Sequence, residues 1–181
     1  MKKLYPLSFV LFFIYWGCDD PKEEYDSTIE VMLWGEYYSI EHTDTLNFRN
    51  NQLTGEIPLE IGNLTNLLYL KLVGNQLTGE IPSEIGNLTN LTTLSIKLND
   101  ITGSIPPEIG NLTKLGYLKL VGNQLTGEIP SEIGNLTNLT TFSLNDNQLT
   151  GSIPSEIGNL TYLTSLSLGS NQLTGEIPSE I

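Results

Sequence analysis

The chain has 181 residues and a net charge of -13, which is the wrong sign for coating phosphate backbones and argues against nucleic acid as a partner. It contains one cysteine and one histidine, Cys18 and His42, so the composition excludes an intramolecular disulfide framework and metal sites that need several such ligands. The sequence has no alanine but 17 glycines and nine prolines, which indicates a chain built on turns rather than an ordinary helical domain.

Residues 1–18 have the pattern of a secretory signal peptide. Two lysines precede an uncharged apolar stretch from Leu4 to Trp16, which is too short to cross about 30 Å of hydrocarbon. Gly17 and Cys18 close the segment, and this junction resembles the processing site of bacterial lipoproteins, in which the cysteine becomes lipidated. The resemblance implies a membrane anchor through Cys18. Secretion without an anchor and an uncleaved leader are the alternatives.

Two short segments follow the leader. Residues 19–30 are predicted to be an acidic tether, because this stretch is too polar to bury much surface. Residues 31–45 are apolar and aromatic but do not share the repeat that follows, so we expect them to form an N-terminal cap. The cap contains Trp34, Tyr37 and Tyr38, and a sugar-stacking site is the alternative interpretation of this aromatic cluster.

A 24-residue repeat occupies residues 46–181. Its six units follow the pattern N-x-L-T-G-x-I-P-x-E-I-G-N-L, with Ile101 in place of the first leucine in unit 3, and the last unit is incomplete. We number the units 1 to 6 from their first residues, Leu46, Leu70, Leu94, Leu118, Phe142 and Leu166. Two glycines in each unit, such as Gly79 and Gly86, are expected to allow turns that a side chain would hinder.

One asparagine recurs in every unit. Its side-chain amide is predicted to bond backbone groups at a corner of the chain, and stacked copies would form a ladder along the molecule. The members of this predicted ladder are Asn51, Asn75, Asn99, Asn123, Asn147 and Asn171.

Unit 2 shows how each repeat should fold. Leu70 and Leu72 would point inward and Lys71 outward, which predicts a short strand that stacks in parallel on its neighbours. Pro82 prevents a helix from running through the unit, and room for a helical turn or two remains after it, up to Leu91. A single unit cannot bury its own apolar face, so stability depends on contacts between neighbouring units.

The repeat resembles the plant-specific class of leucine-rich repeats, found in plant receptor ectodomains and in inhibitors of polygalacturonase. The resemblance implies an α/β solenoid, a right-handed superhelix with a parallel concave β-sheet and short 3-10 or helical turns on the convex side. Trp34 and Gly35 also resemble the Trp-Gly pair of plant N-terminal caps. Those caps carry disulfide cysteines, so the cap of this chain must hold by packing.

Comparison of the six units predicts where a ligand would bind. The variable positions alternate with the strand leucines and would face the concave surface, where members of the family usually bind ligands. This surface holds four of the five bases of the repeats, whereas most acids lie in two glutamate columns elsewhere. The candidate ligand-binding residues are Arg49, Tyr69, Lys71, Lys97, Tyr117, Lys119, Asn145 and Asp146.

The charge distribution supports two interpretations. A weakly basic concave stripe suits an anionic partner, such as an acidic glycan or an acidic patch on a protein. Alternatively, the four bases only reduce charge repulsion within an acidic protein.

Catalysis, cofactors and metals are not expected. A nucleophile paired with histidine would have to use His42 or Cys18, and these lie in the cap and the leader. The carboxylates recur identically in every unit, unlike an acid and a base held in different environments. The glutamate columns also lack the interleaved Asp, Asn or carbonyl ligands of a calcium loop.

The sequence therefore predicts a non-catalytic binding or adhesion scaffold that is exported and lipid-anchored at the bacterial cell envelope or surface, and that recognises protein or glycan. Inhibition of a secreted polysaccharide-degrading enzyme and ice binding by the threonines from Thr54 to Thr174 are alternatives. Residues 69–93 and 117–141 are identical, which indicates duplication of a 48-residue block and favours broad adhesion. The open edge of the last unit predicts edge-to-edge self-association.

Overall fold

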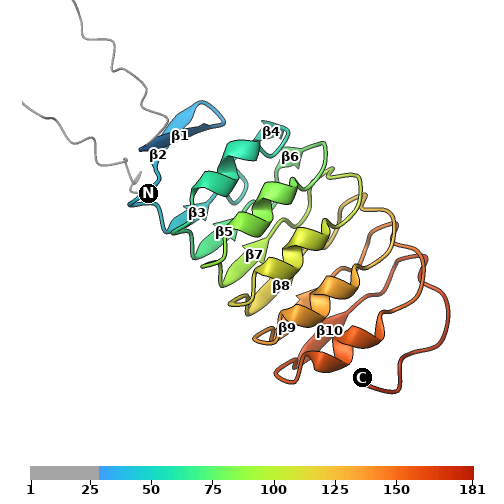
Figure 1. Cartoon of the computed structure of the whole chain (residues 1–181). Helices are drawn as coiled ribbons and strands as arrows, with labels where there is room; N and C mark the ends of the chain where they lie inside the picture. Colours follow the sequence, from blue (N-terminus) through green and yellow to red (C-terminus); the bar gives the residue numbers. More distant parts are fainter. Residues whose placement is uncertain (1–28) are drawn as a thin grey trace, which may run out of the picture.

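A computed structural model of the protein describes residues 29–181 as a β-hairpin followed by a solenoid (Figure 1). The predicted leader, Cys18 and all of the tether before Ile29 lie outside the described residues. Strand β1 begins at Glu30, so the last residue assigned to the tether belongs to the hairpin. The hairpin pairs β1 (Glu30–Leu33) with β2 (Glu36–Ser39) in antiparallel register.

The main sheet contains one strand from each of the six units, and all of its neighbouring strands are parallel. Its strands are β3 (Thr45–Asn47), β5 (Tyr69–Lys71), β7 (Thr93–Ser95), β8 (Tyr117–Lys119), β9 (Thr141–Ser143) and β10 (Ser165–Ser167). Each residue pairs with the residue 24 positions away in the next unit, so the repeat length sets the register.

Short 3-10 helices cover the opposite side of the solenoid from the main sheet (Figure 1). They are η1 (Leu59–Asn63), η2 (Ser83–Asn87), η3 (Pro107–Asn111), η4 (Ser131–Asn135) and η5 (Ser155–Asn159). A proline with extended backbone precedes each helix and fixes its start, as Pro82 does for η2. The predicted fold class, a solenoid with a parallel sheet on one side and short 3-10 turns on the other, is confirmed.

A second, smaller sheet lies between these two sides. It pairs β4 (Thr54–Gly55) with β6 (Gln76–Leu77) in parallel, and single bridges continue the pairing in later units, for example between Glu80 and Thr102. This sheet was not predicted, because its strands are two residues long and carry no alternating hydrophobic pattern.

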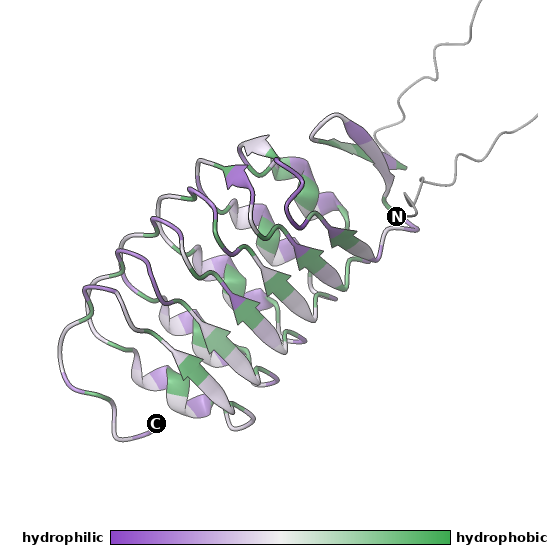
Figure 2. Cartoon of the chain, turned by 180° about the vertical axis from the view of Figure 1, so that it is seen from behind, coloured by the Kyte–Doolittle hydropathy of each residue, from purple (hydrophilic) through white to green (hydrophobic). Residues whose placement is uncertain are grey.

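The core is a column of leucine and isoleucine side chains between the main sheet and the 3-10 helices. Leu70 and Leu72 are fully buried, as the alternation in unit 2 predicts, and equivalent residues are buried in the neighbouring units. Figure 2 shows hydrophobic residues recurring in the strands and helices, with hydrophilic residues in the loops between them. The units thus share one continuous core, as expected of a solenoid.

The asparagine column runs along the corner that follows the main sheet. Asn99 is typical: its Oδ1 accepts a hydrogen bond from the Leu77 N–H at 3.2 Å, and its Nδ2 donates to the Leu72 carbonyl at 2.8 Å. Asn75, Asn123, Asn147 and Asn171 make equivalent bonds to the unit before their own.

Asn51 occupies a different environment from the other asparagines of the column. It is exposed, and it takes part only through its backbone N–H, which donates to Asn75 Oδ1 at 3.0 Å. The five later asparagines therefore form the ladder, and in the described residues every buried side-chain nitrogen and oxygen has a hydrogen-bond partner. This satisfies the condition for placing polar amides in a core.

The two glycines of unit 2 serve different purposes. Gly79 has φ +72°, in the left-handed region that favours glycine, as its predicted turn requires. The explanation offered for Gly86 was wrong, because its φ is not in that region. A Cβ at Gly86 would lie 2.6 Å from the Glu108 carbonyl oxygen, so this glycine allows η2 and η3 to pack closely.

The N-terminal hairpin packs on unit 1 through aromatic contacts. The Trp34 and Tyr38 rings meet the Phe48 ring edge to face, with centroids 5.4 and 6.0 Å apart, and the Trp34 indole N–H donates to the Glu56 carbonyl at 3.2 Å. Burial, with a smaller contribution from the charge of Glu36, raises the pKa of Tyr38 above its ordinary value. At the other end of the described chain, unit 6 is less covered, and Ile177 is 74% exposed.

Candidate functional site

The outward-facing side chains of the main sheet form a surface that we call the sheet face. A hollow of about 390 Å³ lies on this face over units 1 to 4. All four predicted bases of the face line it, together with one of the two predicted tyrosines. These five residues are Arg49, Lys71, Lys97, Tyr117 and Lys119.

The other predicted site residues lie beside the hollow or beyond it. Tyr69 is 42% exposed, and its ring centroid is 5.8 Å from Lys71 Nζ, a cation–π distance. Asn145 and Asp146 follow β9 in unit 5 and do not line the hollow. The Asn145 amide instead donates to Asp146 Oδ2 at 2.8 Å, so this pair bonds internally.

Four further residues line the hollow but were not among the predicted site residues: Asn47, Val73, Thr93 and Ser95. Asn47, Thr93 and Ser95 alternate with the buried strand leucines, and Val73 continues this alternation two residues beyond β5. The alternation therefore contained the signal that could have found them. Ser95 is only 7% exposed and Val73 only 8%, whereas the lysines beside them are half-buried. Small hydroxyl and apolar side chains therefore form a floor, and the longer cationic chains rise around it.

The bases of the hollow form no ion pair with any carboxylate of the described residues. Among residues 29–181 the only ion pair joins His42 to Glu41 at 4.0 Å, and it lies in the cap. Lys114, the fifth base of the repeats, lies off the sheet face and donates to Asn90 Oδ1 at 2.6 Å. Positive charge on the sheet face is thus available to a ligand.

The glutamate columns lie away from the hollow. The Glu84 column is in the first turns of the 3-10 helices, and Ser83 Oγ donates to Glu84 Oε2 at 3.3 Å. Glu56 belongs to the other column and packs across Gly79 of the next unit. In the part of the chain that the structure describes, no three His, Cys, Asp or Glu side chains gather closely enough to hold a metal ion.

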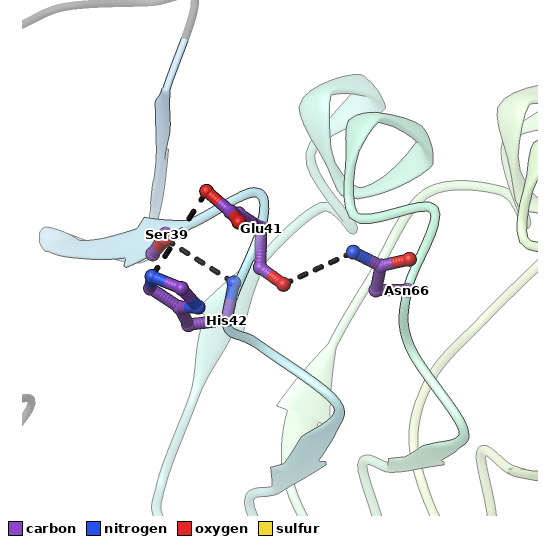
Figure 3. Close-up of polar contacts among 4 residues, drawn as sticks. All are labelled: Ser39, Glu41, His42 and Asn66. Carbon is purple, nitrogen blue, oxygen red and sulfur yellow. Dashed lines mark hydrogen bonds and ion pairs between the residues drawn. The ribbon is translucent and has the colours of Figure 1, made fainter.

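The surroundings of the single histidine resemble a catalytic triad in composition but not in geometry. Ser39, the last residue of β2, lies close to Glu41 and His42 in the turn that follows (Figure 3). Ser39 Oγ accepts from the backbone N–H of His42 at 3.3 Å, and its hydroxyl is not bonded to the imidazole. Both His42 and Glu41 are largely exposed, so the cluster is a solvated turn. A nucleophilic serine needs a bond from its hydroxyl to the base.

The threonines of the ice-binding alternative, from Thr54 to Thr174, lie along the second sheet and are exposed. Several of their hydroxyls are already bonded to backbone carbonyls: Thr102 Oγ1 donates to the Gly79 carbonyl at 3.0 Å, and later members repeat this bond. These hydroxyl protons point into the protein backbone, which leaves fewer donors for an ordered water layer.

The comparisons with known proteins agree with this architecture. A family model described as a leucine-rich repeat region matches residues 44–172. A search of curated protein sequences finds no match. Solved structures with similar folds include three receptor kinase ectodomains from Arabidopsis thaliana.

The ectodomain of GASSHO1/SCHENGEN3, in complex with CASPARIAN STRIP INTEGRITY FACTOR 2, is 45% identical over 73% of this chain, with a TM-score of 0.71. HAESA, in complex with the peptide hormone IDA and the co-receptor SERK1, is 42% identical over 76% of this chain, with a TM-score of 0.74. SOBIR1 is 33% identical over 78% of this chain and 77% of its own, with a TM-score of 0.70. The match spans only 16% of the GASSHO1/SCHENGEN3 chain and 23% of the HAESA chain.

Proposed function

The chain belongs to the leucine-rich repeat proteins, and we propose that it is a non-catalytic scaffold whose sheet face binds an anionic protein or glycan ligand. The observation that carries the proposal is the placement of four bases around one hollow, unpaired with any carboxylate of residues 29–181, in a chain of net charge -13. The four bases are Arg49, Lys71, Lys97 and Lys119. Charge placed only to reduce repulsion would be more stabilising beside the glutamate columns. The lysines instead gather where a partner can reach them.

The similar structures support ligand binding by this architecture. Two of the ectodomains described above were solved with a named peptide or protein partner bound. Because this chain covers a small part of each, the likeness supports a binding role in general and does not transfer their ligands.

The cap geometry supports a non-catalytic role. His42 is the only histidine of the chain, and it neither accepts a proton from Ser39 nor lies near the hollow. The hollow itself presents cations, hydroxyls and the aromatic ring of Tyr117, and it holds no histidine or carboxylate to act as a general base.

We also propose that the protein works outside the cytoplasm. The charged and apolar pattern of residues 1–18 supports export, and the Gly17-Cys18 junction supports a lipid anchor at the cell envelope or surface. No helix within residues 29–181 is long and apolar enough to cross a membrane.

Arrays of acidic peptides and acidic glycans, compared with neutral counterparts, test the binding proposal. We expect binding that weakens as salt rises and that is lost when Arg49, Lys71, Lys97 and Lys119 are all replaced by serine. Lys114→Ser is the matched control, because this lysine is off the face and should leave binding unchanged. Retained binding in the quadruple variant, with the same dependence on salt, would show that the hollow is not the site.

Inhibition of a polysaccharide-degrading enzyme is a second use of the same surface. It is tested by adding the protein to pectin-degrading enzymes and measuring their residual activity, with the quadruple variant as control. Activity unchanged by a molar excess of protein counts against inhibition.

A further inference from the structure

The four cations of the sheet face follow an alternating pattern. Each strand presents two outward positions beside the hollow, and the cation occupies the later position in units 1 and 3 but the earlier one in units 2 and 4. The later positions hold Arg49, Val73, Lys97 and Val121, and the earlier ones hold Asn47, Lys71, Ser95 and Lys119. From unit 1 to unit 4, the positive charge therefore alternates between the later and the earlier outward position.

The strand geometry gives this pattern fixed dimensions. Adjacent strands are about 4.8 Å apart, and the two outward positions of one strand are about 6.7 Å apart. Lys71 and Lys119 lie on the same side with one strand between them, since both pair with Ser95 of β7. Cations on one side therefore recur about every 10 Å, and the opposite side is offset by one strand.

Tyrosines follow the same two-unit period. Tyr69 and Tyr117 are 42% and 49% exposed and are the first residues of β5 and β8, with the smaller Thr93 of β7 between them. An exposed tyrosine offers an apolar ring face together with a hydroxyl that can donate and accept. The tyrosines thus lie on either side of the threonine and serine of β7, which form part of the floor of the hollow.

The pattern ends after unit 4. In unit 5 the corresponding outward residues are Ser143 and Asn145, and Asp146 follows them. A partner lying along the solenoid axis would meet four alternating cations and then a neutral to acidic surface.

We infer that the ligand of this face is a linear β-1,4-linked uronic acid polysaccharide lying across the strands of units 1 to 4. This inference rests on the proposed function and names its ligand class. In an extended β-1,4-linked chain each sugar ring is flipped relative to the ring before it. The carboxylates therefore project from alternate edges of the sugar chain, and each sugar lengthens the chain by nearly one strand spacing. One carboxylate then meets each cation, and sugar faces can stack on Tyr69 and Tyr117.

An extended acidic peptide fits this surface less well. Its side chains also alternate, but they advance by about 3.4 Å per residue, so same-side carboxylates recur every 6.8 Å or so. Cations on one side of the hollow are about 10 Å apart, so when one carboxylate meets a cation, the next carboxylate on that side lies about 3 Å from the position of the next cation. A sugar chain keeps its register along all four units.

The decisive variant exchanges two residues within unit 2, Lys71→Val with Val73→Lys. It leaves composition and net charge unchanged but places three consecutive cations on one side of the hollow. We expect the full chain to bind β-1,4-linked tetramannuronate, and the exchange to weaken that binding about tenfold. Circular dichroism, expected to be unchanged, shows that the variant is folded. The melting temperature should fall by a few degrees, because Val73 is only 8% exposed.

Three further probes decide the ligand class. β-1,4-Mannotetraose lacks the carboxylates and α-1,4-linked tetraguluronate is a buckled chain, so both should bind at least tenfold more weakly than tetramannuronate. Affinity should rise from the disaccharide to the tetrasaccharide and then level off, since four units carry cations.

Equal affinity of the exchanged and natural proteins for tetramannuronate would overturn the inference, because only net charge would then matter. Tighter binding of tetraglutamate than of tetramannuronate would overturn it in favour of a peptide ligand. If no uronate binds while another acidic ligand is still captured through Arg49, Lys71, Lys97 and Lys119, the uronate inference fails and the proposed function stands. If replacing those four bases affects no ligand at all, both fail.

Discussion

Residues 69–93 and 117–141 have the same sequence, and their backbones are nearly the same, but their side chains meet different neighbours. Val73 is 8% exposed, whereas its copy Val121 is half-buried. The Lys71 ammonium lies over the Tyr69 ring, a contact not seen between Lys119 and Tyr117. Since each residue packs on those 24 positions before and after it, the repeat fixes the backbone while the adjacent units fix the environment.

This pair of segments allows the same substitution to be made twice in one molecule. Any difference between the two results then comes from the neighbours, because the local sequence is constant. Four such comparisons follow from the contacts described above.

The largest expected effect is on the asparagine ladder. Asn123→Ala would leave the buried Ile101 N–H and the Ile96 carbonyl without partners, and should cost about 3 kcal/mol of unfolding free energy. Asn75→Ala should cost less, since its partners Asn51 and Leu53 are exposed or half-buried and can bond water. Chemical denaturation of both variants measures the difference. Equal losses would show that burial of the partner does not set the cost.

The next effect concerns the turn glycines Gly79 and Gly127, which have φ +72° and +74°. Alanine at either should cost about 1 kcal/mol from the backbone alone. A Cβ at Gly79 would also lie 2.7 Å from Glu56 Cγ, whereas at Gly127 the nearest atom is Ser104 Cβ at 3.5 Å. Gly79→Ala should therefore cost about 1 kcal/mol more, because the Glu56 side chain must move.

A double variant separates the two contributions. Replacing Glu56 by serine reproduces the surroundings of Gly127, so Gly79→Ala made in that background should cost the same as Gly127→Ala. A persistent difference would locate the cost elsewhere than in the glutamate contact.

Ligand binding should distinguish the two lysines of the pair. Lys71 has a cation in both adjacent units, Arg49 and Lys97, whereas Lys119 has one only on the side of unit 3. Lys71→Ser should therefore weaken tetramannuronate binding about tenfold and Lys119→Ser about threefold. Isothermal titration calorimetry at fixed salt measures the affinity of both variants. A larger loss for Lys119→Ser than for Lys71→Ser would contradict an alternating pattern of cations centred on units 2 and 3.

The smallest difference is expected at an exposed pair. Asn90 and Asn138 donate equivalent bonds to the Thr65 and Thr113 carbonyls, but only Asn90 also accepts from a lysine, Lys114. Asn90→Ala should cost a few tenths of a kcal/mol more than Asn138→Ala, because exposed polar bonds contribute little. Making both substitutions in a Lys114→Met background should remove the difference.

The repeat made most of the fold predictable. Regular spacing of Leu70 and Leu72 indicates strand and core, and Pro82 indicates where the 3-10 helix begins. The close approach at Gly86 could not be predicted, because it depends on the distance between η2 and η3, which no sequence pattern reports. The antiparallel pairing inside the cap was also missed, since aromatic residues there obscure the two-residue turn at Trp34 and Gly35.

The candidate site was predictable in its cations but not in its extent. Lys71 and Lys119 were identified because outward positions vary between units, whereas Ser95 and Val73 are small or apolar and offered no chemical signal by themselves. Asn145 and Asp146 occupy the equivalent variable positions of unit 5, but their mutual hydrogen bond and position beyond β9 separate them from the hollow.

The direction of the asparagine ladder bears on how this gene can change in length. Each asparagine completes the corner of the unit before it, as Asn99 does for Leu72 and Leu77. An inserted block of 24 residues therefore supplies the asparagine amide that bonds the corner of the unit before it. The asparagine of the unit after it bonds the corner of the inserted block in the same way. Unequal recombination between identical segments such as 69–93 and 117–141 would yield longer or shorter proteins whose junctions are all bonded. Under our proposal, each added 48-residue block adds two cations to the binding face. The number of blocks encoded by the gene would then set the length of the ligand that the face can bind.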